Sequence, residues 1–166
     1  PGDFNLARHC LSGKPAEKIA LIVAGAQTEI WTYGAIEDAV LRMAEGLRRT
    51  GLEPVQRLLI RMGNSLDYAL IFFAANAAGA IPIPASPMLT MREVAGLLAD
   101  SGTRFIAWDG GLELPPTEHI SVLGPADIGK LKSAPRGVYA GTAAEDPASL
   151  IYTSGTGGEP KGVMLS

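Results

Sequence analysis

Short β-prone runs alternate with longer segments of helical periodicity along this sequence of 166 residues. In the helical segments apolar residues recur three or four positions apart, as on the buried face of an amphipathic helix. Such alternation is typical of α/β proteins, in which helices connect parallel strands. We therefore predict an α/β fold, a layered and largely parallel sheet with flanking helices. The predicted strands are residues 19–23 and 29–32, which form a hairpin, then 58–62, 81–85, 105–108, 119–123, 149–152 and 163–165.

The three predicted helices have recognisable ends. The first follows Thr32, the second follows Asn64 or Ser65, and in the third Thr90 and Glu93 have the spacing of a capping box. Glycines lie where each helix is expected to stop, because glycine adopts the left-handed conformation that ends many helices. These glycines are Gly51, Gly79 and Gly102.

Two prolines fall within the predicted strand 81–85. Pro82 and Pro84 each lack the backbone N–H that a central strand must donate. We therefore expect this strand at an edge of the sheet.

The segment 109–146 has no clear periodicity and is rich in glycine, proline and small residues. We predict an irregular connecting segment here, with 119–123 as its one short strand. Its carboxylates Asp109, Glu145 and Asp146 are interpreted as solvated loop residues rather than catalysts. His9 and His119 are isolated in the sequence and receive no role, whereas Trp31, Phe72, Phe73 and Trp108 are core candidates.

A loop suited to phosphate binding connects the last two predicted strands, at residues 152–162. Its glycines allow the backbone N–H groups to approach an anion closely, and its hydroxyls and lysine add donors and a positive charge. The alternative is a glycine-rich surface turn that binds nothing. That alternative explains the glycines but neither the hydroxyls, the lysine nor a loop longer than an ordinary hairpin needs. The candidate phosphate-binding residues are Thr153, Ser154, Gly155, Thr156, Gly157, Gly158 and Lys161.

Two common phosphate-loop types do not match. A Walker loop has Gly-Lys-Ser/Thr entering a helix, whereas Lys161 follows Pro160 and leads into a strand. The dinucleotide fingerprint Gly-x-Gly-x-x-Gly begins at Gly155 but has Pro160 in its last place.

Composition excludes several other classes of function. A formal net charge of −3 provides no overall positive field for nucleic acid, and a single cysteine, Cys10, cannot form an internal disulfide. No metal-ligand spacing is visible. The most apolar run, 68–81, is too short to cross a bilayer, and the first residues do not resemble a secretion signal. We expect a cytoplasmic protein with no transmembrane segment.

The segment Leu150–Met164, which reads Leu-Ile-Tyr-Thr-Ser-Gly-Thr-Gly-Gly-Glu-Pro-Lys-Gly-Val-Met, resembles the phosphate-loop signature of the acyl-adenylate-forming enzymes. Four shorter segments resemble further landmarks of that family in the same order. The resemblance covers about residues 17–166. It implies that residues 1–166 are the N-terminal α/β subdomain of a larger AMP-binding domain, truncated just after the loop. The shorter segments are Trp31-Thr32-Tyr33, Gly63-Asn64-Ser65, residues 78–84 and Asp100-Ser101-Gly102.

The activity that this resemblance implies is a two-step ligation. A carboxylic acid reacts with Mg²⁺-ATP to give an acyl adenylate and pyrophosphate, and a thiol, usually of coenzyme A, then takes the acyl group. The loop would hold the departing β- and γ-phosphates, and no catalytic residue is expected in this part of the chain. Thr156 is the one candidate for a metal contact, and the missing C-terminal part of the chain would supply the rest of the site.

Two features bear on which member of the family this is. Gly157 stands where the family usually has a second threonine, which removes one expected hydroxyl. The segment Ser86-Pro87-Met88-Leu89-Thr90 is more similar to acyl- and aryl-CoA synthetases than to peptide-synthetase domains. The alternatives are an amino-acid-activating adenylation domain and a non-catalytic nucleotide-binding or scaffold module.

Overall fold

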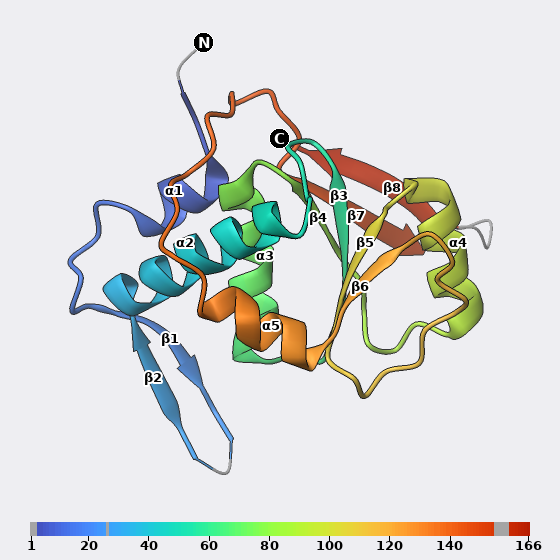
Figure 1. The fold of residues 1–166 in the computed structure, drawn as a ribbon, viewed down its shortest axis with the longest axis horizontal. Coiled ribbons are helices and arrows are strands. Elements are labelled where there is room, and N and C mark those ends of the chain that lie inside the picture. The colour runs from blue at the N-terminus through green and yellow to red at the C-terminus, as the bar shows by residue number, and fades with distance from the viewer. Residues whose placement is uncertain (1–2, 26, 155–159) are drawn as a thin grey trace.

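A computed structural model describes residues 3–25, 27–154 and 160–166. Its centre is a four-stranded parallel sheet with the strand order β4-β3-β5-β6. Helices cover both faces of this sheet (Figure 1). The predicted α/β fold with a largely parallel sheet is therefore confirmed. The strands are β3 (Arg57–Arg61), β4 (Ile81–Pro84), β5 (Phe105–Trp108) and β6 (Ser121–Leu123), and the helices are α1 (Leu6–Leu11), α2 (Tyr33–Arg49), α3 (Leu66–Ala78), α4 (Met91–Ser101) and α5 (Pro125–Lys132).

The central strand β3 contributes to two separate hydrophobic cores. Leu58 and Ile60 point into the core formed with α1, α2, α3 and α5, whereas Leu59 points into the core formed with α4. All three side chains are fully buried. Successive residues of a strand face opposite sides, so a strand buried on both faces needs an unbroken apolar run. This requirement explains the run Leu58-Leu59-Ile60.

Strand β4 lies at the edge of the parallel sheet, as its prolines predict. The N–H of Ile81 donates to the carbonyl of Gln56, immediately before β3, at 2.8 Å, and the N–H of Ala85 donates to the Ile60 carbonyl of β3 at 3.1 Å. Pro82 and Pro84 alternate with these donors, at positions whose N–H would face away from β3. The prolines therefore remove no hydrogen bond from the sheet.

The expected helix ends are also present. Thr32 accepts from the N–H of Ala35, Ser65 from that of Tyr68, and Thr90 and Glu93 form the complete capping box. Of the two candidates for the second cap, Ser65 is the one used. Gly79 and Gly102 end α3 and α4 in the left-handed conformation.

Two antiparallel hairpins flank this body, β1 (Ile19–Val23) with β2 (Glu29–Thr32) and β7 (Ser149–Ser154) with β8 (Pro160–Leu165). The first hairpin extends away from the body, and the second lies along β4 and α4 (Figure 1). Trp31, Phe72, Phe73 and Trp108 are only partly buried against the two cores, so they line the cores rather than fill them.

Helix α5 lies inside the segment 109–146, for which the sequence predicted no helix. Pro125 starts it, the N–H of Gly124 donates to the Asp127 carboxylate at 3.3 Å, and the helix ends after eight residues. Only Ile128 and Leu131 are buried in it. A helix this short shows too little periodicity to be recognised, and it is stabilised by packing against α2 rather than by propensity.

Close packing between α2 and α5 gives the first testable prediction. A Cβ at Gly46 would lie 2.9 Å from the Leu131 Cα, whereas a Cβ at Gly96 in α4 would meet nothing within 4 Å. Gly46→Ala is therefore expected to lower the free energy of unfolding by about 1 kcal/mol, because overpacking outweighs the gain in helix propensity. The matched Gly96→Ala is expected to raise it by about 0.5–1 kcal/mol. Urea denaturation measures both, and a stabilising Gly46→Ala would contradict the packing described.

Candidate functional site

The candidate phosphate-binding residues lie at one end of the β7–β8 hairpin. Thr153 of β7 pairs directly with Lys161 of β8, and Ser154 pairs with Pro160. Directly paired residues of an antiparallel ladder share one face, so the Thr153 hydroxyl and the Lys161 ammonium lie on the same side of the hairpin. Both side chains are exposed. The other four candidates, Gly155, Thr156, Gly157 and Gly158, lie outside the described residues.

The loop predicted at residues 152–162 is shorter in the structure. Pairing continues to Ser154 and Pro160, which leaves only residues 155–159 between the paired strands. This length is within the range of ordinary hairpin connections, so the predicted long loop was wrong and loop length does not favour phosphate binding. Strands pair through backbone groups, so the pattern of side chains in the sequence does not show how far the pairing of β7 with β8 continues. Support for phosphate binding therefore comes from the hydroxyls and the lysine.

Contacts with the parallel sheet and with α4 fix the hairpin in place. The Tyr152 hydroxyl donates to the Asp100 carboxylate of α4 at 2.5 Å, and the Ser149 hydroxyl donates to the Pro82 carbonyl at 3.1 Å. Leu150 is buried between them. A Cβ at Gly162 would lie 3.2 Å from Tyr152 Cζ, so a side chain there would crowd this ring. The end of the hairpin that carries Thr153 and Lys161 is thus tethered to α4.

Burial and the hydrogen bond to Asp100 raise the pKa of Tyr152 to about 12. A raised pKa in the folded state stabilises the protein below the unfolded tyrosine pKa of about 10, and this contribution is lost between pH 10 and 12. We expect the free energy of unfolding to fall less steeply between pH 10 and 12 in Tyr152→Phe than in the unsubstituted protein. Unfolding free energies from urea titrations at pH 8, 10 and 11 measure it, with Tyr33→Phe as the control. An unchanged slope in Tyr152→Phe would contradict the prediction.

Asp109 lies in a loop, as the sequence predicted, but it is only partly exposed and makes specific hydrogen bonds. It lies at the carboxyl end of β5, where it accepts from the N–H of Gly63 at 2.6 Å and from that of Gly111 at 3.0 Å. Burial alone would raise the pKa of Asp109, but backbone N–H donors, Gly63 and Gly111 foremost, bring it below its ordinary value. Its role is to join the loop after β3 to the loop after β5. An aspartate two residues before a glycine is typical of such turns.

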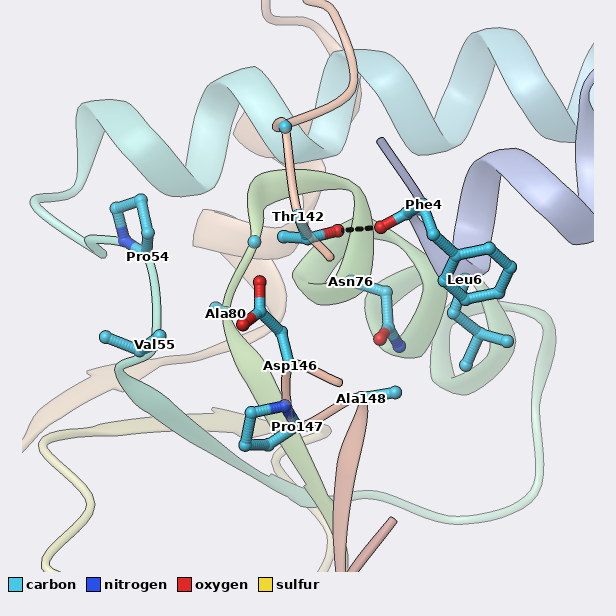
Figure 2. Close-up of a pocket in the computed structure, with 12 residues that line it drawn as sticks. Phe4, Leu6, Pro54, Val55, Asn76, Ala80, Thr142, Asp146, Pro147 and Ala148 are labelled. Carbon is cyan, nitrogen blue, oxygen red and sulfur yellow. Dashed lines mark hydrogen bonds between the residues drawn. The ribbon is translucent and has the colours of Figure 1, made fainter. Parts of the chain in front are cut away.

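A cavity of about 240 Å³ lies at the other end of the hairpin, beside Ala148 (Figure 2). The cavity is bounded by the amino-terminal segment and by the segment that leads into β7. These two segments are joined by a hydrogen bond from the Thr142 hydroxyl to the Phe4 carbonyl. Asp146 lines this cavity and is an exposed loop residue, as expected. Its negative charge would repel a phosphate. This cavity is therefore separate from the candidate phosphate site.

Among the described residues no three or more His, Cys, Asp or Glu side chains gather in a way that could hold a metal ion. Magnesium in nucleotide sites is held chiefly by the phosphates, water and one or two protein ligands. Magnesium bound in this way needs no such cluster of protein side chains. No helix among the described residues has both the length and the apolar character needed to span a membrane.

The described residues thus form an α/β domain in which a hairpin bearing a hydroxyl and a lysine lies beside the parallel sheet. The profile of the AMP-binding enzyme family matches residues 7–166. The chain belongs to this family.

Individual relatives are CoA ligases and other synthases. The chain is 32% identical over 149 residues to a 4-hydroxybenzoate–CoA/benzoate–CoA ligase of Rhodopseudomonas palustris, which covers 80% of this chain and 28% of the relative. It is 29% identical over 141 residues to surfactin synthase subunit 1 of Bacillus subtilis, covering 81% of this chain and 4% of that protein. The crystal structure of a long-chain-fatty-acid–CoA ligase from Archaeoglobus fulgidus matches with a TM-score of 0.88 and 25% identity, over 99% of this chain and 37% of that one. The chain thus spans less than a third of the length of the first relative.

Proposed function

We propose that this chain is the amino-terminal part of an ATP-dependent, AMP-forming carboxylate–CoA ligase, and that the β7–β8 hairpin binds the phosphates of ATP. The observation that supports this most directly is the pairing of Thr153 with Lys161 on one exposed face of the hairpin, in a chain that belongs to the AMP-binding enzyme family. The proposed phosphate-binding set also includes Ser154 and the four residues outside the described part, Gly155, Thr156, Gly157 and Gly158.

The proposed reaction has two steps. A carboxylate oxygen attacks the α-phosphorus of Mg²⁺-ATP, the bond from that phosphorus to the bridging oxygen breaks, and pyrophosphate leaves. A thiolate of coenzyme A then attacks the acyl carbonyl, and AMP leaves with the electron pair of the acyl–oxygen bond. Negative charge grows on the pyrophosphate only in the first step. A lysine and hydroxyl donors positioned beside the leaving phosphates stabilise that charge.

An aromatic or fatty acid is the proposed substrate class, in keeping with the similarity to the benzoate–CoA and fatty-acid–CoA ligases. An amino-acid-activating adenylation domain is the second candidate, because a surfactin synthase subunit is also similar. We place the full-length enzyme in the cytoplasm, where ATP and coenzyme A are available.

Acid-dependent pyrophosphate release by a full-length enzyme containing this chain tests the proposal. The panel contains benzoate, 4-hydroxybenzoate, straight-chain fatty acids and several amino acids, each with ATP, Mg²⁺ and with or without coenzyme A. We expect release with at least one aromatic or fatty acid, and formation of its CoA thioester. Release with amino acids alone would favour the second candidate. No release with any acid would contradict both.

A further inference from the structure

Two arginine side chains line a cavity at the amino-terminal end of the parallel strands. Arg57 is the first residue of β3, and Arg104 immediately precedes β5. The two strands are neighbours in parallel register, with Leu58 beside Phe105. That register places Arg57 and Arg104 side by side on the face of the sheet that α4 covers. The cavity has a volume of about 240 Å³ and is lined by Val55, Gln56, Arg57, Gly102 and Arg104.

The guanidinium of Arg57 is fixed in position but incompletely paired. Its Nη1 donates to the Ser101 carbonyl at the end of α4 at 2.7 Å. Its Nε is buried without a hydrogen-bond partner in the described chain. Gly102 lies close by, so that a Cβ there would be 3.9 Å from Nη1. The absence of a side chain at Gly102 keeps this side of the guanidinium open to the cavity.

The charged side chains that line this cavity are both positive. No carboxylate lines the cavity, and none of the ion pairs among the described residues includes Arg57 or Arg104. The field of Arg57 extends to Tyr152, whose pKa it lowers against the larger opposing effects of burial and Asp100. Two adjacent arginines repel each other, and a bound anion would relieve that repulsion.

Val55 lies in a β-turn beside this cavity, in which the N–H of Gln56 donates to the Glu53 carbonyl at 3.2 Å. It lines the same cavity with a φ of 59°, a left-handed conformation that is rare and strained for a β-branched residue. The side chain is 65% exposed, so burial does not explain the conformation. The turn accounts for it, since a proline in second place and a residue of positive φ in third place are typical of a type II turn.

We propose that the cavity between Arg57 and Arg104 binds a small phosphate-type dianion, at a site distinct from the β7–β8 hairpin. The planar guanidinium offers paired donors that match the oxygens of a phosphate, and two such groups side by side match a doubly charged oxyanion better than a carboxylate. The amide of Gln56 adds a neutral hydrogen-bonding group. The phosphate can be a free ion or part of a nucleotide.

Amide chemical shifts of the 166-residue chain during titration with inorganic phosphate at constant ionic strength test this site. The chain carries Lys161→Ala so that binding at the hairpin is suppressed. We expect saturable shifts at Gln56, Arg57 and Gly102. Acetate in the same titration should produce no saturable shift at these amides. A second titration uses ATP in place of inorganic phosphate. The ligand with the lower midpoint concentration shows whether the site prefers a free phosphate ion or the phosphates of a nucleotide.

Two arginine variants decide the result. Arg104→Gln is expected to weaken phosphate binding roughly tenfold, because it removes charged hydrogen bonds from the anion. Arg104 is exposed, so the variant should retain the fold, which the shift dispersion checks. Arg92→Gln, also exposed but on α4 away from the cavity, is the charge-matched control and should bind as the unsubstituted chain does. Equal weakening in both variants, or shifts that rise linearly without saturation, would overturn the proposal.

Discussion

Replacing Lys161 by alanine in the full-length enzyme is expected to slow acyl-adenylate formation by about 100-fold or more. This is the usual loss when one preorganised charge-stabilising donor is removed from a reaction site. Lys161 lies opposite Thr153 at the end of the hairpin that α4 tethers through Tyr152. The thiol-transfer step should slow much less, because charge develops on pyrophosphate only during adenylation.

The two half-reactions are measured separately, by single-turnover formation of the adenylate and by thioester formation from a preformed adenylate. Lys161→Arg is expected to recover part of the rate, since it retains the positive charge. Lys14→Ala removes an exposed lysine elsewhere and should leave both steps unchanged. Equal losses in the two half-reactions of Lys161→Ala would refute the assigned role.

The 166-residue chain alone is expected to bind ATP with a dissociation constant of about 1 mM or weaker and to show no turnover. Charge-assisted hydrogen bonds from the hairpin contribute about 1.5–3 kcal/mol each. Association costs at least about 4 kcal/mol before any ordering of the binding groups. Thr153 and Lys161 are both exposed, so the phosphates would also remain largely in contact with water. The small surplus corresponds to millimolar affinity.

Isothermal titration calorimetry with Mg²⁺-ATP measures this affinity, and a pyrophosphate assay with the same acid panel measures turnover. The Lys161→Ala chain serves as the control for binding at the hairpin. Micromolar affinity, or any acid-dependent release of pyrophosphate, would contradict the expectation. Either result would show that these residues form a more complete nucleotide site than the described hairpin provides.

The sequence predicts the parallel sheet because apolar runs and helix caps are patterns among neighbouring residues. The unbroken apolar run of β3, the prolines of β4 and the Thr90–Glu93 capping box each specify their own element. Helix α5 was missed because its stability depends on a distant partner, Gly46 of α2. The pattern of eight residues alone does not show that this helix packs closely against α2.

The same distinction applies to the sites. Glycine, hydroxyl and lysine residues clustered in residues 152–162 were recognisable because they are neighbours in sequence. The hydrogen bond from Gly63 to Asp109, and the adjacency of Arg57 and Arg104, arise only from the parallel pairing of β3 with β5. In the sequence the one available signal is that an arginine stands at the start of each of these two strands.

The nucleotide product formed by the full-length enzyme tests the central claim most directly. Incubation with ATP, Mg²⁺, coenzyme A and an accepted carboxylic acid should yield AMP and pyrophosphate in equal amounts, with one CoA thioester for each AMP. Formation of ADP and inorganic phosphate instead would contradict the assignment of an adenylate-forming reaction to this chain.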